Sequence, residues 1–91
     1  MKVRFTATAF AELNQVFEHI ARENPRAAVA VLERIGQLVG RISEFPHMAY
    51  ATDEPGVRVI PVGRFPYLIF YTVGSGDVVI LHVRHAARLR P

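Results

Sequence analysis

The sequence contains no cysteine and no tryptophan, and none of its apolar runs is long enough to cross a membrane. Without cysteine the chain has no disulfide framework and no thiol nucleophile. The stretch Met1-Lys-Val-Arg4 leads into a mixed segment and not into the apolar run of about 7–15 residues that marks a secretory signal peptide. We therefore expect a cytoplasmic protein that has no disulfides and does not associate with a membrane.

Acidic residues are also scarce, and none follows Asp77. Lys and Arg number 11 against 8 Asp and Glu, which gives a formal net charge of +3. Residues 82–91 hold two of the four histidines together with three arginines. A cationic cluster of this kind attracts phosphates or an acidic partner. We therefore look for the function in its members, which are Arg84, His85, Arg88 and Arg90.

The length of 91 residues fits one domain, residues 1–91. A chain this short buries only roughly 60–65% of the surface that its unfolded form exposes. Half of the residues are hydrophobic, 51%, and the mean hydropathy is +0.18. Surplus apolar surface on a small basic chain suggests burial against another chain, although an unusually apolar monomer would have the same composition.

The first half of the chain predicts a short strand and two helices. Residues 2–6 alternate, with Val3 and Phe5 on one face. Thr6 or Thr8 can cap the first helix. We expect its apolar stripe to consist of Phe10, Leu13, Phe17 and Ile20, with Glu12 among the residues largely on the solvent side.

A second helix is predicted from Pro25 to about Glu44. Asn24 favours the N-cap position and Pro25 the first helical position. Because almost no linker separates the helices, we expect an antiparallel pair. The predicted stripe is Ala28, Val31, Leu32, Ile35, Leu38, Val39 and Ile42, and the four-residue spacing of Gly36 and Gly40 suggests close approach of another element.

The second half predicts a loop and three strands, at residues 46–56, 57–62, 67–73 and 78–83. Pro61 indicates an edge or an irregular end for the first of these strands, whereas residues 67–73 have the composition of a central strand. The order strand-helix-helix-strand-strand-strand predicts an α+β fold. In it, the helix hairpin packs on one face of a mostly antiparallel four-stranded sheet.

The predicted central strand is apolar on both faces. Residues 67, 69, 71 and 73 share one face, and Leu68, Phe70 and Thr72 share the other. One set packs against the helices, and Tyr71 is expected in the core with its hydroxyl group reaching a partner at the rim. The other set lines a concave surface or is covered by a partner.

The order of elements, the segment Pro66–Val73 and the ending Val83–Arg88 resemble the RelE/ParE superfamily of bacterial type II toxins. The break at Asn24-Pro25, the segment Gly63–Tyr67 and the His-x-x-Arg ending are most similar to the ParE branch. The resemblance implies a toxin held inactive by a cognate antitoxin, a small DNA-binding protein, in a hetero-oligomer. It also implies a target: DNA gyrase for the ParE branch, or mRNA on the ribosome for the RelE branch.

The same resemblance bears on catalysis. RelE-like enzymes place an arginine after the aromatic residue that opens the central strand, where this chain has Leu68, and lysines on the preceding strand, where it has Val59 and Pro61. Of the positions compared, only Arg88 matches, because RelE-like enzymes also have an arginine after the last strand. The ParE branch is therefore favoured, with a toxin that acts by binding. The alternatives are a ribonuclease that uses His85, Arg88 and Arg84 with Glu54 as the nearest carboxylate in the sequence, and a non-toxic antitoxin-binding module.

Eight residues are candidates for binding the target or the antitoxin: Arg58, Arg64, Leu68, Phe70, Arg84, His85, Arg88 and Arg90. Structural alternatives stay open, such as a hydrogen bond from His85 to a backbone carbonyl group and plain solvation of the arginines. His82 and His85 lack further ligands at a useful spacing, so we expect no metal site, and we expect no cofactor.

Overall fold

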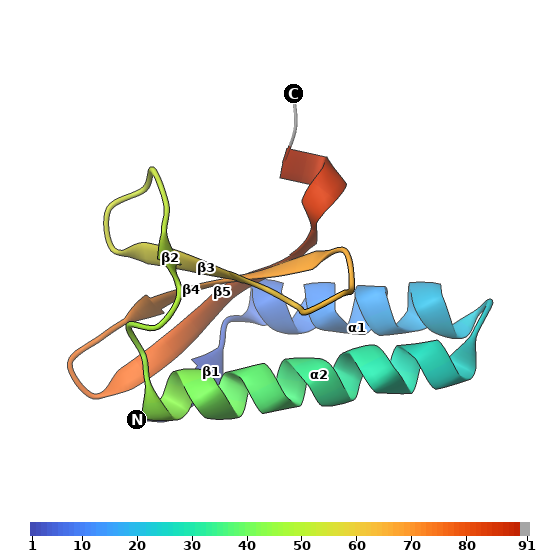
Figure 1. The fold of residues 1–91 in the computed structure, drawn as a ribbon, viewed down its shortest axis with the longest axis horizontal. Helices are drawn as coiled ribbons and strands as arrows, with labels where there is room; N and C mark the ends of the chain where they lie inside the picture. The colour runs from blue at the N-terminus through green and yellow to red at the C-terminus, as the bar shows by residue number, and fades with distance from the viewer. Residues whose placement is uncertain (90–91) are drawn as a thin grey trace.

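The computed structural model describes the backbone of residues 1–89 and the side chains of residues 1–87. The elements are β1 (Lys2–Phe5), α1 (Ala7–Ala21), α2 (Pro25–Glu44), β2 (Tyr50–Ala51), β3 (Val57–Pro61), β4 (Tyr67–Val73), β5 (Asp77–His85) and the 3₁₀ helix η1 (Ala86–Leu89). The two helices lie side by side along one face of the sheet (Figure 1). Within residues 1–89, no helix combines the length and hydrophobicity that a membrane span requires.

The strands form one sheet in the order β1-β5-β4-β3-β2. β1 pairs with β5 in parallel, and the other three pairings are antiparallel. The α+β prediction and the central position of β4 are therefore confirmed. The predicted strand count of four was wrong, because the predicted loop contains β2, whose residues Tyr50 and Ala51 pair with Val59 and Arg58 of β3. A strand of two residues is too short to show an alternating pattern.

Both helices begin where the capping residues predict. The Thr6 side chain accepts a hydrogen bond from the Ala9 N–H at 3.0 Å, and the Asn24 side chain accepts one from the Ala27 N–H at 3.1 Å. Pro25 is the first residue of α2, a position where its missing N–H costs nothing. Because only three residues separate the helices, they fold back on each other as the predicted antiparallel pair (Figure 1).

The predicted apolar stripe of α2 is largely correct. Its buried members are Ala28, Val31, Ile35, Leu38 and Ile42. Leu32, however, is 41% exposed. No atom lies within 4 Å of a Cβ built on Gly36 or Gly40. The prediction that these glycines admit another element was therefore wrong within the part of the chain that the structure describes.

The predicted stripe of α1 was partly wrong. Phe10 is 60% exposed, and the side chains that pack on the core are Ala9, Leu13, Val16 and Ile20. Both sets have the helical spacing of three and four residues, so periodicity alone does not choose between them. Ala9 is fully buried, and its small side chain lets α1 approach the sheet closely.

Tyr71 lies in the core as predicted, with no exposed surface. Its hydroxyl group donates a hydrogen bond to the Pro46 carbonyl oxygen at 2.8 Å. Burial raises the pKa of the Tyr71 phenol above its ordinary value, and the positive charge of Arg58 partly offsets this effect.

The raised pKa of Tyr71 predicts a loss of stability in alkali. The phenol ionises near pH 10 in the unfolded chain but only at higher pH in the folded protein. The free energy of unfolding should therefore be independent of this group below about pH 10 and fall as the pH rises further. Tyr71→Phe should remove that decrease and cost about 1 kcal/mol at neutral pH through the lost hydrogen bond. Urea unfolding of both proteins between pH 7 and 11 checks this, and equal alkaline slopes would contradict it.

Candidate functional site

A β-bulge in β5 determines which side chains face away from the helices. Phe70 pairs with His82 and Tyr71 pairs with Ile80, so Leu81 is the extra residue. Because side chains alternate along a strand, one extra residue reverses the faces of all that follow. With the bulge, His82 and Arg84 lie on the outer face, the face of the sheet opposite the helices. Without it, they would have pointed into the core.

The bulge also marks the point beyond which β5 no longer pairs with β1. β1 pairs with β5 only as far as Ile80, and from there the free edge of β5 meets the start of α1. The Thr6 hydroxyl group donates to the Leu81 carbonyl oxygen at 3.3 Å, and the Val83 N–H donates to Glu12 Oε1 at 3.1 Å. Two side chains of one helix segment thus satisfy backbone groups that a further strand would otherwise pair.

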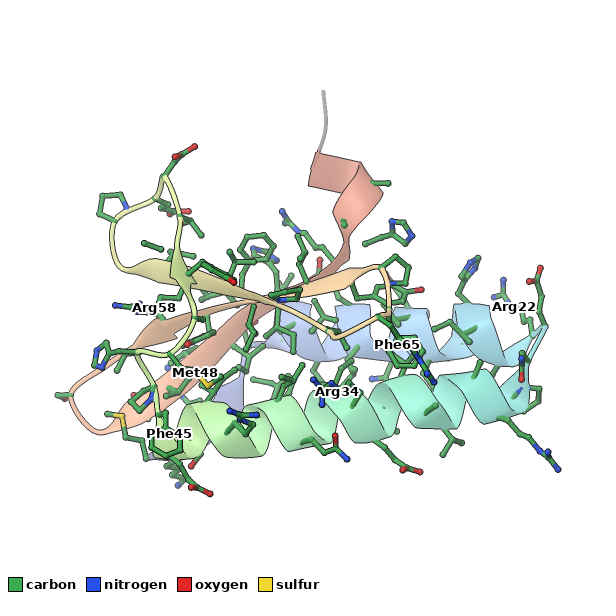
Figure 2. All side chains as sticks on the ribbon, viewed as in Figure 1. Arg22, Arg34, Phe45, Met48, Arg58 and Phe65 are labelled. Carbon is green, nitrogen blue, oxygen red and sulfur yellow. The ribbon has the colours of Figure 1, made fainter. Side chains whose placement is uncertain are left out.

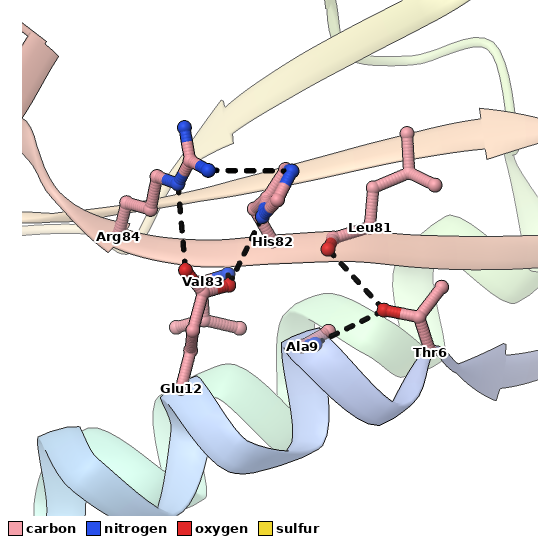
Figure 3. A network of polar contacts seen from close by, with 7 residues as sticks. All are labelled: Thr6, Ala9, Glu12, Leu81, His82, Val83 and Arg84. Atoms are coloured by element: carbon pink, nitrogen blue, oxygen red, sulfur yellow. Dashed lines mark hydrogen bonds and ion pairs between the residues drawn. The ribbon is translucent and has the colours of Figure 1, made fainter.

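Glu12 joins His82 and Arg84 in what we call the β5 cluster (Figure 3). Glu12 Oε1 lies 3.1 Å from His82 Nδ1, and Glu12 Oε2 accepts from Arg84 Nε at 3.4 Å. Arg84 Nη2 lies 3.4 Å from His82 Nε2. The carboxylate of Glu12 can only accept, so His82 Nδ1 acts as the donor in this arrangement. The guanidinium group of Arg84 can only donate, so His82 Nε2 acts as the acceptor, which is the neutral tautomer with its proton on Nδ1.

The location of Glu12 corrects the sequence analysis. Its side chain is only 22% exposed, whereas the helical pattern placed it among the solvent-side residues. Glu54 was predicted only as the nearest carboxylate for the ribonuclease alternative. Glu12 is also the carboxylate that pairs with Arg84, a contact that the sequence does not predict. The sequence offers no signal for this contact, because it arises only when α1 packs along the free edge of β5.

Two hollows border the β5 cluster, and Arg84 lines both of them. The outer-face hollow has a volume of about 470 Å³, and Glu54, Phe70 and His82 also line it. The second hollow, of about 500 Å³, lies between α1 and the end of β5, and its lining includes Glu12, Tyr67 and His85. Glu54 thus faces the same space as His82 and Arg84, although it makes no ion pair with Arg84 among the described residues.

His85 lies on the opposite face from its neighbour Arg84. Its ring packs edge-on against Tyr67, with the ring centroids 5.4 Å apart. Its Nδ1 accepts a hydrogen bond from the Ala87 N–H at 3.1 Å. The structure therefore differs from the interpretation of His85 as bonded to a backbone carbonyl group, because the partner of His85 Nδ1 is a backbone N–H group. On the outer face, the histidine beside Arg84 is His82.

The structure describes the side chains of four other candidate residues, and two of these four lie on the outer face. Leu68 and Phe70 lie on the outer face, where they pair with Arg84 and His82 respectively. Phe70 packs edge-on against His82, with centroids 6.4 Å apart. The side chain of Arg88 and the whole of Arg90 lie outside the described residues.

Arg58 and Arg64 are separate from the β5 cluster. Arg58 Nη1 donates to the carbonyl oxygens of His47 and Ala49, at 3.3 and 3.0 Å, and thereby holds the segment before β2. Arg64 lies in the turn between β3 and β4, with its guanidinium carbon 5.3 Å from the centroid of the Phe65 ring. Residues 1–87 contain no group of three or more side chains arranged to hold a metal ion.

These features define a class of protein: a small α+β domain with a helix hairpin on one face of its sheet and a charged cluster at the end of its last strand. The family of the ParE toxin of type II toxin-antitoxin system, parDE, matches residues 3–90. The chain belongs to this ParE toxin family and is a type II toxin of the RelE/ParE superfamily.

Two relatives agree with the family, and a solved structure has a similar fold. The chain is 34% identical over 94 residues to the Y4kP protein of Sinorhizobium fredii, covering 99% of this chain and 93% of that protein. It is 35% identical over 91 residues to the toxin RelE2 of Caulobacter vibrioides, covering 97% of this chain and 98% of that one. Its fold is similar to that in the chromosomal ParDE system of P. aeruginosa, with a TM-score of 0.82 at 22% identity over 93% of this chain and 95% of that one.

Proposed function

We propose that this toxin inhibits DNA gyrase by binding to it and is neutralised by a cognate antitoxin. The observation that carries the proposal is the chemistry of the outer face. Both ring nitrogens of His82 already have partners, and the residue that pairs with Arg84 on β4 is the apolar Leu68. An acid or base poised for phosphodiester cleavage needs a free nitrogen or oxygen near the substrate, and this arrangement favours binding over bond cleavage.

The outer face offers a binding surface of mixed chemistry. Leu68 and Phe70 provide apolar area, and Arg84 provides a cation whose position is fixed by Glu12. Arginine and aromatic residues are the side chains that most often dominate the energy of a protein interface. The surface therefore suits a large protein partner, and the antitoxin would block it by covering the outer face and the helix pair.

A supercoiling assay tests the proposal. Purified toxin added to gyrase, relaxed plasmid and ATP should inhibit supercoiling and increase the amount of cleaved DNA. Prior addition of the antitoxin should restore activity. Full gyrase activity at a large molar excess of folded toxin would contradict the proposal.

The outer-face hollow supports one second candidate, an mRNA interferase. Glu54, His82 and Arg84 line one hollow, and together they are a carboxylate, an imidazole and a phosphate-binding cation. In that case His82→Gln should abolish mRNA cleavage on ribosomes, while antitoxin binding stays unchanged. Persistent cleavage by this variant would exclude His82 as the catalytic histidine.

A non-toxic antitoxin-binding module is the third alternative. Expression of the chain without its antitoxin separates this alternative from the other two. Normal growth with a folded, antitoxin-binding chain would favour the module, whereas growth arrest would exclude it.

A further inference from the structure

A second cationic site lies between α2 and the turn that joins β3 to β4. Arg34 on α2 and Arg64 in the turn line a hollow of about 380 Å³, with Ala30 and Phe65 as apolar neighbours. Figure 2 shows Arg34 on α2 and Phe65 in the β3–β4 turn, the two elements that border the hollow. Neither arginine lines the hollows beside the β5 cluster, so this site is distinct from that cluster.

Within residues 1–87, neither arginine of this site has an acidic partner, a property that they share with Arg22, Arg26, Arg41 and Arg58. Arg4 pairs with Asp77 and Arg84 pairs with Glu12, but within residues 1–87 no ion pair involves Arg34 or Arg64. Arg34 is nonetheless only partly exposed. Charged side chains that leave water are normally paired. Arg64 is exposed, but it brings a second unpaired positive charge to the hollow in which Arg34 is partly withdrawn from water. This arrangement favours the binding of an anion there.

Each guanidinium group is also held in place before any ligand arrives. Arg34 Nη1 donates to Gln37 Oε1 at 3.3 Å. Arg34 Nε lies 3.0 Å from the position of a Cβ built on Gly63, so any larger residue at position 63 would require the Arg34 side chain to shift by a few tenths of an ångström. Arg64 packs on the ring of Phe65. Arginines fixed in this way lose little conformational entropy when they bind a ligand.

We propose that this hollow binds the carboxylate side chain of a protein segment that docks against α2 and the β3–β4 turn. A planar carboxylate matches the fork of a guanidinium group, and Ala30 and Phe65 give the flanking apolar side chains of the segment a surface to cover. Glu33 also lines the hollow, so its two arginines are opposed by one carboxylate and its net positive charge suits a single carboxylate better than a continuous chain of phosphates. That the segment belongs to the antitoxin rests on the proposed function.

The site itself can be tested by NMR titration of the full chain, with the arginine Nε–Hε resonances as the readout. The probe is the peptide acetyl-Ala-Leu-Glu-Leu-Ala-amide, and the matched control replaces its Glu with Gln. The Glu peptide should shift the resonances of Arg34 and Arg64 with an affinity about tenfold higher than that of the Gln peptide, since a charged acceptor strengthens the hydrogen bonds. Equal effects of both peptides, no shift at either arginine, or saturable shifts with inorganic phosphate but not with the Glu peptide would each overturn the proposal.

The source of the segment is tested separately by the affinity of the chain for its antitoxin. Arg34→Gln and Arg64→Gln should each weaken binding about tenfold or more, as expected for charged hydrogen bonds at an interface. Arg41→Gln, an exposed residue of the same helix, should change binding less than about twofold. If the wild-type chain does not bind the antitoxin at all, the proposed function fails. If all variants bind equally well, only the assignment of the segment to the antitoxin fails.

Discussion

Glu12→Ala should destabilise the fold by about 2 kcal/mol, because it removes the acceptor of hydrogen bonds from Val83, His82 and Arg84 at once. The largest part should come from the Val83 N–H, which would lose its partner at the free edge of β5. His82 and Arg84 are about one-third exposed or more, so water can replace part of what they lose. Urea unfolding followed by circular dichroism measures the effect.

Glu18→Ala is the matched control for this prediction. Glu18 lies on the same helix, is exposed, and makes no ion pair within residues 1–87. Its substitution should change the free energy of unfolding by less than about 0.5 kcal/mol. The loss of free energy of unfolding in Glu12→Gln should lie between those of the two alanine variants. The amide oxygen of Gln can still accept the hydrogen bond from the Val83 N–H, but it has no negative charge to pair with Arg84. If Glu12→Ala and Glu18→Ala have the same free energy of unfolding, the contact between Glu12 and β5 does not stabilise the fold, and the prediction is wrong.

Arg84→Ala should abolish growth arrest when the toxin is expressed without its antitoxin. Arg84 is the one Lys or Arg among the described residues that line the outer-face hollow, and an arginine at the centre of a protein interface typically contributes about 2 kcal/mol, or roughly 30-fold in affinity. The fold should persist, because Glu12 keeps its contacts with Val83 and His82. Loss of one half-exposed ion pair costs less than about 1 kcal/mol.

Plating efficiency under induction, with the amount of folded protein checked in the same cells, measures the effect of Arg84→Ala. Arg26→Ala serves as the control, since Arg26 is exposed and lines none of the three hollows described. It should leave the toxin fully active. Undiminished toxicity of Arg84→Ala would exclude the outer face as the surface that acts on the target.

Most of the fold could be predicted from the sequence, because its signals are local. The Asn24-Pro25 pair sets the start of α2, and the aromatic and β-branched run 67–73 forms the central strand β4. The errors have physical causes. Phe10 and Ala9 both fit a helical stripe, and only the close approach of α1 to the sheet decides that the smaller residue is buried.

The candidate site could be predicted only in part, because its geometry depends on a bulge and on contacts between distant residues. Four apolar residues in a row, 78–81, hide the alternation of β5. Residues that are three apart on a regular strand point to opposite faces. Ile80 and Val83 are three apart and both are buried, which is the sign of an extra residue between them. The pairing of Glu12 with Arg84, 72 residues away, follows from tertiary packing alone and leaves no pattern in the sequence.

The central claim is that this toxin acts by occupying its target and breaks no bonds in RNA. Its most direct test is to express the chain without its antitoxin and to follow chromosomal DNA breaks and the 5′ ends of mRNA in the same culture. The account predicts DNA breaks and a DNA-damage response within the first generations, with mRNA ends unchanged. New mRNA ends within codons on ribosomes, with intact chromosomal DNA, would contradict it.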